Sequence, residues 1–335
     1  MNRQALGCLA VGMLLAGAMV RAEDWPQWGG VHRDNKSAET GLLKSWPTDG
    51  PALLWSGTNI GKGYSGVAVA KGVTYVVGEN TMTAFDPAGK IKWQQHGKAF
   101  GRDSTPTVDG DLIFVRTPTE AASLDAETGS IKWECNTIAK FQVDPKKGNR
   151  NAESLLVDGN NLILTVGGTA GLVAVNKLTG ETVWQSTVND YPAWCSPALI
   201  SCGKRKIVVT MMFTQMVGVD AGTGALLWSY PVIHSNPVYC NTPVLADGVV
   251  FSCVSQGWGD VGLQLADDGA SVKEAYHKKD FAISCGGFVE LNGYAYAATD
   301  SGGMCLKIKT GEKAWGPDKG GIFYSVKLLK LCRAG

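Results

Sequence analysis

The sequence lacks the residue spacings by which several kinds of functional site are recognised. Its nine cysteines include no adjacent pair, no Cys-x-x-Cys and no Cys-x-x-Cys-His, which excludes zinc-ribbon, thioredoxin-like and c-type haem patterns. Its four histidines share no ligand spacing, so no metal site is predicted. There is no Gly-x-Ser-x-Gly element and no phosphate-cradling loop. The sequence therefore predicts no catalytic residue.

Charge imbalance and long hydrophobic runs are also missing. Lys and Arg total 31 against 30 Asp and Glu, without a basic stripe. The sequence therefore predicts no nucleic-acid partner and no binding to an anionic membrane surface. No stretch after residue 22 reaches the roughly 18 apolar residues that span a bilayer, so no membrane span is predicted.

The first 22 residues have the pattern of a secretory signal peptide. Arg3 supplies the positive start, residues 9–20 are largely apolar, and Val20-Arg21-Ala22 is a small-residue cleavage site. We therefore expect an exported protein, periplasmic or extracellular. Export permits disulfides, whose pairing stays open, but buried free thiols are the simpler expectation for the cysteines after Cys8.

Helical periodicity is absent after residue 22, and a repeat takes its place. Segments that open on Asp, Asn or Lys and turn on Gly recur about every 40 to 45 residues, the interval of a four-stranded propeller blade. We expect the aromatic residues that end them to pack between neighbouring sheets. The copies end at Trp55, Trp93, Trp133, Trp184, Trp228, the degenerate position Ala275, and Trp315.

The second complete copy shows how a repeat forms a blade. Asp109-Gly110 is a hairpin signal between two short extended runs, and residues 121–124 predict a third strand. Asp125 can then accept hydrogen bonds from backbone amides ahead of it, and Gly129 can adopt a positive φ. Residues 131–133 complete a fourth strand. The sequence therefore predicts an all-β propeller of four-stranded antiparallel blades.

These copies resemble the pyrroloquinoline-quinone-like repeat, the blade unit of quinoprotein alcohol dehydrogenase-type propellers. The similarity covers about residues 24–315, and the opening DWPQWGG at residues 24–30 resembles the start of secreted bacterial propellers of this class. Members of that group resemble both the outer-membrane-assembly propeller lipoprotein and the polyvinyl-alcohol dehydrogenases.

For the quinone-using dehydrogenases, the resemblance implies a vicinal Cys-Cys disulfide over the cofactor, a tryptophan beneath it, a calcium ion held by Glu and Asn, and a catalytic Asp. This chain has no Cys-Cys pair, and none of the calcium ligands maps onto it. No cofactor is therefore predicted. Pyrroloquinoline quinone (PQQ) and calcium enter only with the dehydrogenase alternative.

The resemblance implies eight blades, whereas the sequence holds six complete repeats and a partial one. We expect a signal peptide at 1–22 and an N-terminal segment at 23–63 whose residues 51–55 form a closing strand. The C-terminal part has the pattern of a truncated repeat, and how the ring closes stays open. The expected blades are 64–93, 104–133, 154–184, 195–228, 241–275 and 284–315, with a partial blade at 316–335.

Ligands of propellers gather where the innermost strands begin, around the central channel. The aligned positions there are more polar and aromatic than the strands that follow them, which favours a binding funnel. The alternative is that they are ordinary strand ends. The candidate binding residues are Tyr64, Arg102, Asn151, Glu153, Trp194, Asn241 and Cys285, and Cys195, Cys240 and Gly286 occupy aligned positions.

Three functions remain open from the sequence. The leading hypothesis is an exported binding or scaffolding module for a protein or a small carbohydrate- or alcohol-type ligand, because the blade repeats are clear and no catalytic set accompanies them. The first alternative is a PQQ-dependent dehydrogenase of alcohols or sugars. The second is a structural partner in outer-membrane assembly.

Overall fold

The computed structural model describes residues 23–96, 100–117, 120–144, 146–148, 152–233, 239–254, 258–279, 281, 283, 287–299 and 302–318. The predicted signal peptide lies outside these residues, as does the predicted partial blade after residue 318. Within the described ranges, no helix is long and apolar enough to cross a membrane.

Twenty-four strands form six four-stranded antiparallel sheets, which confirms the predicted blades. In each blade, consecutive strands pair in chain order. The strands are β1–β4 (Val67–Ala70, Val73–Gly78, Thr81–Phe85, Ile91–His96), β5–β8 (Thr107–Asp109, Leu112–Arg116, Glu120–Asp125, Ile131–Asn136), β9–β12 (Leu156–Asp158, Asn161–Thr165, Leu172–Asn176, Thr182–Gln185), β13–β16 (Ala198–Cys202, Arg205–Met211, Gln215–Asp220, Leu226–Pro231), β17–β20 (Val244–Ala246, Val249–Val254, Gly259–Leu265, Val272–Lys278) and β21–β24 (Phe288–Leu291, Tyr294–Thr299, Gly302–Lys307, Glu312–Asp318).

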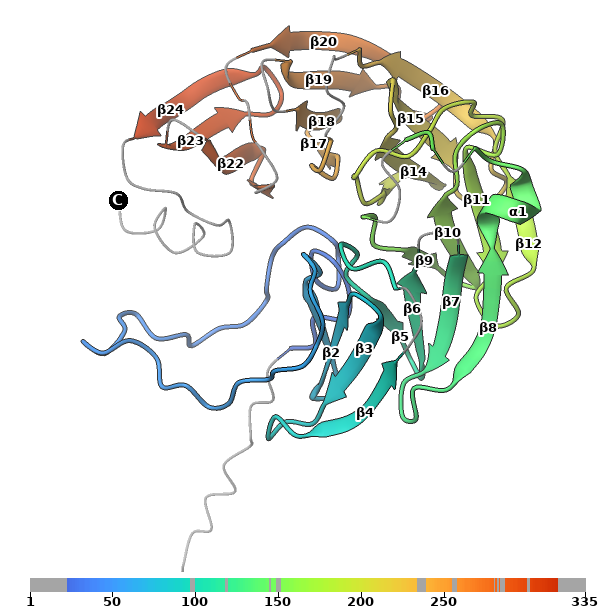
Figure 1. Cartoon of the computed structure of the whole chain (residues 1–335). Coiled ribbons are helices and arrows are strands. Elements are labelled where there is room, and N and C mark those ends of the chain that lie inside the picture. The colour runs from blue at the N-terminus through green and yellow to red at the C-terminus, as the bar shows by residue number, and fades with distance from the viewer. Residues whose placement is uncertain are drawn as a thin grey trace, which may run out of the picture.

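The sheets fan around a common centre as blades 1 to 6 (Figure 1). The first strands of successive blades contact one another from β1 through β5, β9 and β13 to β17, and the fourth strands lie on the rim. Among the described strands, the arc is open between blade 6 and blade 1 (Figure 1). The starts of the inner strands therefore converge on one axial region.

The turn before each fourth strand behaves as its sequence predicts. Asp125 accepts hydrogen bonds from the amides of Glu127 and Thr128 at 3.1 and 2.9 Å, and Gly129 has a φ of +71°. The Asp220 carboxylate accepts from the amides of Gly222 and Thr223 in the same way. These local bonds fix the direction in which the rim strand leaves the turn.

Blades are joined by an aromatic ring of one blade that packs against the turn glycine of the next. The ring N–H or O–H donates to a backbone carbonyl in that same turn, so the contact is both apolar and hydrogen-bonded. The prediction that repeat aromatics pack between sheets is confirmed at these joints. The ring, glycine and carbonyl residues are Trp93, Gly129 and Ala126 (3.1 Å); Trp133, Gly180 and Lys177 (2.9 Å); Trp184, Gly224 and Ala221 (3.0 Å); and Tyr276, Gly311 and Ile308 (2.6 Å).

Tyr276 corrects one sequence assignment. The sequence placed the degenerate aromatic position at Ala275, but Tyr276 pairs across the sheet with Gly262, as Trp228 pairs with Gly218 in the preceding blade. The register of β19 and β20 shifts just after Gly262. Blade 4 has the same shift after Gly218, but the β19–β20 hairpin carries two further residue pairs before its turn. Counting from the turn therefore missed the tyrosine.

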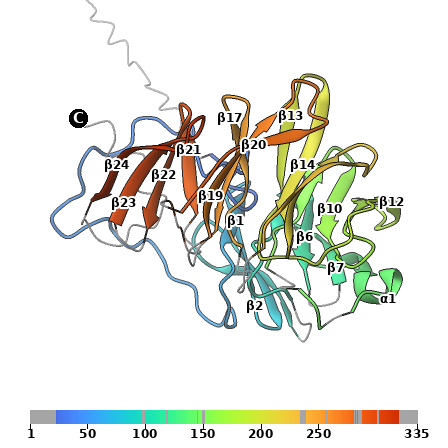
Figure 2. The same ribbon diagram turned by 90° about the horizontal axis from the view of Figure 1, so that it is seen from above.

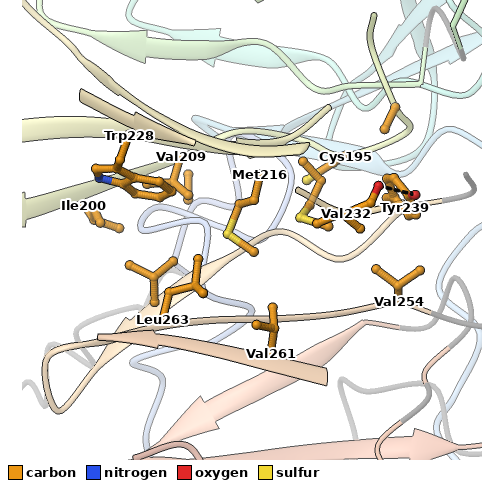
Figure 3. Close-up of a cluster of buried hydrophobic side chains, with 14 of the residues drawn as sticks. Cys195, Ile200, Val209, Met216, Trp228, Val232, Tyr239, Val254, Val261 and Leu263 are labelled. Carbon is orange, nitrogen blue, oxygen red and sulfur yellow. Dashed lines mark hydrogen bonds between the residues drawn. The ribbon is translucent and has the colours of Figure 1, made fainter. Parts of the chain in front are cut away.

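The joint between blades 4 and 5 is built differently. Gly269 faces Ile207 and Cys202, and the Cys202 thiol lies 3.1 Å from the carbonyl oxygen of Asp267. Trp228 lies within a large buried cluster with Met216 (Figure 3), and within the described residues its indole nitrogen has no hydrogen-bond partner. Apolar packing therefore carries this joint.

Residues 51–55, predicted as a closing strand, belong to no sheet in the structure. Leu53 and Leu54 are 81% and 90% exposed, so they lack the cover that a blade position would provide. Trp55 nevertheless packs against Gly89 of blade 1 and stacks on Phe85 at a centroid distance of 5.5 Å. The aromatic contact of a repeat is present there without its strand.

One short helix departs from the β pattern. α1 (Thr137–Phe141) follows β8, and the Asn136 side chain caps it by accepting from the Ala139 amide at 2.8 Å. Figure 2 shows α1 at the edge of the array, far from β21–β24. A helix of five residues is too short to produce a helical periodicity in the sequence.

Part of the chain segment before the blades lies near the centre of the arc, and the rest runs out through its open side (Figure 1, blue). We call residues 24–36 the axial segment. Trp25 exchanges two backbone hydrogen bonds of 2.8 Å with Val69 of blade 1, and the Arg33 side chain is 6% exposed among the inner strands. The described fold is therefore an arc of blades with an irregular segment at its axis.

Candidate functional site: an aromatic funnel at the axis

A cavity of about 570 Å³ opens where the inner strands begin. That volume lies within the range of small-molecule and peptide pockets. We call this cavity the funnel. It is lined by Trp28, Tyr64, Arg102, Asp103, Ala152, Trp194, Ser196 and Cys240.

The structure brings three of the predicted binding residues together in the funnel: Tyr64, Arg102 and Trp194. Tyr64 is 88% exposed and Trp194 is 41% exposed. Two large rings that remain this accessible beside a concave surface are unusual for residues that only pack a core. Both rings can therefore contact a ligand without any rearrangement of the blades.

Arg102 is positioned by its backbone and leaves its side chain available. Its carbonyl accepts from the amides of Tyr64 and Ser65, both at 2.9 Å, which ties the approach to blade 1 to the approach to blade 2. Its guanidinium is half-exposed and lies 3.7 Å from Glu79 and 3.9 Å from Asp103. At those separations the ion pairs are loose, so the guanidinium can donate to an incoming group.

Glu153 does not line the funnel, although the sequence placed it there. Its carboxylate is 2% exposed, accepts from the Thr165 amide at 2.9 Å and lies 3.5 Å from the Arg116 guanidinium. Burial raises the pKa of Glu153, and Arg116 and Thr165 oppose that rise. Burial likewise lowers the pKa of Arg33 to about 10. These groups form a buried polar network next to the funnel.

Asn241 is also buried rather than exposed to the funnel. Its side-chain amide donates to the carbonyls of Cys253 at 2.9 Å and Ile283 at 3.2 Å. Its position therefore links blade 5 to the chain that enters blade 6. The other two predicted residues, Asn151 and Cys285, lie outside the described residues.

Sequence reasoning missed several lining residues, of which Trp28 is the largest. It reaches the funnel from the axial segment, and its indole nitrogen donates to the Thr242 hydroxyl at 3.3 Å. Because Trp28 lies outside the repeat, aligning blades cannot find it. The available signal was a second tryptophan beside Gly29-Gly30, separate from the repeating pattern.

The chemistry of the described lining favours binding. Three of the described cysteines, Cys195, Cys202 and Cys253, are free thiols. Burial raises the pKa of Cys195 to about 11, so its thiol stays protonated near neutral pH and is a poor nucleophile. The described part of the chain contains no group of three His, Cys, Asp or Glu side chains arranged for a metal ion.

The funnel's donors do not fit the calcium ion that the resemblance implies. Calcium takes six to eight oxygen ligands, whereas Asp103 supplies the only carboxylate of the described lining. The nearby carboxylate of Glu153 is already engaged by Thr165 and Arg116. The described residues therefore do not assemble a calcium site here.

The model of one protein family, described as outer membrane protein assembly factor BamB, matches residues 46–194 and again 170–316. The BamB of Burkholderia pseudomallei is 28% identical over 233 residues, which cover 65% of this chain and 55% of that protein. The chain thus spans little more than half the length of this relative.

Two solved structures share the fold. The crystal structure of BamB from Moraxella catarrhalis has a TM-score of 0.55 at 16% identity, over 75% of this chain and 71% of that one. A europium-containing methanol dehydrogenase has a TM-score of 0.56 at 14% identity, over 78% and 69%. The two neighbours differ in function and resemble this chain equally well, so the fold alone does not choose between them.

Proposed function

The chain belongs to the family of the outer membrane protein assembly factor BamB, and from that membership we propose that it is an exported binding and scaffolding propeller whose funnel docks a protein of outer-membrane assembly. The observation that carries the proposal is the exposed set of Tyr64, Trp194 and Arg102 around a concave cavity. Aromatic residues and arginine are the types that dominate the binding energy of protein interfaces.

The funnel's shape supports a peptide segment or loop as the docked element. The cavity is large enough for a few side chains, and its rim offers aromatic faces together with one half-exposed guanidinium. A partner loop can place an apolar side chain between the rings while its backbone carbonyls accept from Arg102. Specific binding then needs no catalytic group in the funnel.

Site-specific photocrosslinking tests this proposal. A photoreactive residue in place of Tyr64, in the full chain expressed with an intact cell envelope, should crosslink to an outer-membrane assembly protein identified by mass spectrometry. The substitutions Tyr64→Ala and Trp194→Ala should each weaken binding of that partner about tenfold, the effect of losing one interface hot spot. Trp46→Ala is the matched control, since Trp46 is 54% exposed outside the funnel.

Three results would overturn the proposal. One is equal partner binding by the two funnel variants and the control. Another is sustained dye reduction with an alcohol or sugar after PQQ and calcium are added, because turnover would make the chain a dehydrogenase. A small carbohydrate that binds the funnel and leaves the partner's affinity unchanged would also contradict docking at this site.

A further inference from the structure

The axial segment bonds to five of the six blades, although it is only thirteen residues long. Its contacts reach the inner or adjoining strands of blades 1, 2, 3, 5 and 6, which are far apart along the chain. They are Lys71 N to Asp24 (3.0 Å) in blade 1, Val108 N to the Pro26 carbonyl (2.7 Å) in blade 2, Arg33 to the carbonyls of Ser154 (2.8 Å) and Leu155 (3.0 Å) before and in blade 3, Trp28 to Thr242 (3.3 Å) before blade 5, and Lys36 to Glu290 (3.0 Å) in blade 6.

We propose that the axial segment is an internal brace that holds the open arc of blades together from its centre. In an array of repeats, each unit contacts only its neighbours, so a terminal unit has one interface where an inner unit has two. Blades 1 and 6 are the terminal units of the described arc. The brace gives each of them a second attachment that does not pass through the rim.

The same segment also lines cavities near the axis. Trp28 lines the funnel, whereas Pro26 and Gln27 line a second cavity of about 360 Å³ with Asp109 and Lys177. The brace therefore supplies part of the wall of the funnel as well as its contacts with the blades.

Arg33 is the central anchor of the brace. Its guanidinium donates to the two blade 3 carbonyls and to the Gln27 side chain at 3.0 Å, and it is almost fully buried. A buried cation is unfavourable unless its donors are satisfied. Burial disfavours the Arg33 charge, and within the described residues its Nε has no partner. The hydrogen bonds of its two terminal nitrogens therefore define where the segment docks.

Hydrogen exchange of the full chain, followed by mass spectrometry, tests the brace. Lys36→Met removes the attachment to blade 6, and Trp28→Phe keeps an aromatic ring but removes the bond to Thr242. Lys36→Met should raise amide exchange in β21 and β22 about fivefold, and Trp28→Phe should do the same in β17 and β18, because local opening follows the local attachments. Both should leave β10 and β11 of blade 3 unchanged. Lys92→Met, which removes an exposed ion pair between blades 1 and 2, is the matched control.

Arg33→Met provides a second arm. It should increase exchange at the amides of Trp25, Val69 and Val108 and also in β21 and β22, which have no contact with Arg33. If this variant does not fold, Lys36→Met and Trp28→Phe alone test the proposal. The proposed brace would be wrong if exchange stayed unchanged in blade 6 of Lys36→Met and in blade 5 of Trp28→Phe, or if it rose equally in blade 3.

Discussion

The joint between blades 3 and 4 makes a sharp prediction about Gly224. A Cβ atom added at this glycine would lie 2.5 Å from the Trp184 ring, and its φ of +77° is in the left-handed region. Gly203, in the same blade, has a φ of +57° but no heavy atom within 4 Å of an added Cβ. The two glycines thus share the backbone strain and differ in the steric contact.

We expect Gly203→Ala to lower the free energy of unfolding by about 1 kcal/mol, the cost of a left-handed alanine. Gly224→Ala should cost about 2–4 kcal/mol, because overpacking adds about 1–3 kcal/mol. Urea unfolding followed by far-ultraviolet circular dichroism measures both without relying on tryptophan fluorescence.

A double-mutant cycle isolates the ring contact. Trp184 is 7% exposed and donates to the Ala221 carbonyl, so Trp184→Ala alone should cost about 3–5 kcal/mol. In the double variant the added methyl group has no ring to collide with. The stability lost in the double variant should therefore be smaller than the sum of the two single losses by about 1–3 kcal/mol. Equal losses of stability for Gly224→Ala and Gly203→Ala, or strict additivity in the cycle, would show that Trp184 does not pack against Gly224.

Three further predictions concern single side chains. Burial raises the pKa of Glu153 above its ordinary value of 4.5. The stability that Glu153 contributes is therefore complete below pH 4.5 and is lost as pH rises through its raised pKa. Glu153→Gln should remove this loss from a series of urea midpoints between pH 4 and 8. Bonds from Lys132 and Thr128 lower the pKa of Asp125 to about 2, so its contribution to stability is present above the ordinary value of 3.8 and is lost as pH falls toward 2. Asp125→Asn should reduce this loss in a second series of urea midpoints between about pH 2 and 5. Asn136→Ala removes the cap of α1 and should cost about 1 kcal/mol, seen as faster amide exchange of Ala139 with unchanged exchange in β21.

Local patterns were readable from the sequence because neighbouring residues determine them. The turn at Asp125 and Gly129 is fixed by bonds within five residues, so its form follows from residue type alone. Because the same turn recurs in successive repeats, it also predicted a fold of repeated blades. The aromatic joints were predicted as well, except where a longer hairpin moved the ring to Tyr276 or where Cys202 took its place.

The candidate site was less accessible to sequence reasoning. Tyr64, Arg102 and Trp194 were found because they align between blades. Trp28 was not, since its partner Thr242 lies 214 positions away and neither residue carries a local pattern. Alignment also cannot tell a lining carboxylate from a buried one, and the Arg116 side chain that engages Glu153 decides that question.

The four aromatic joints between blades all run in the same chemical direction. The earlier blade supplies the aromatic donor, and the later blade supplies the glycine and the carbonyl, as at Trp93 and Gly129. An array built from such head-to-tail contacts has two unlike ends, and a unit can be added in only one orientation. Duplication of one repeat would therefore lengthen the arc without any new kind of contact having to evolve.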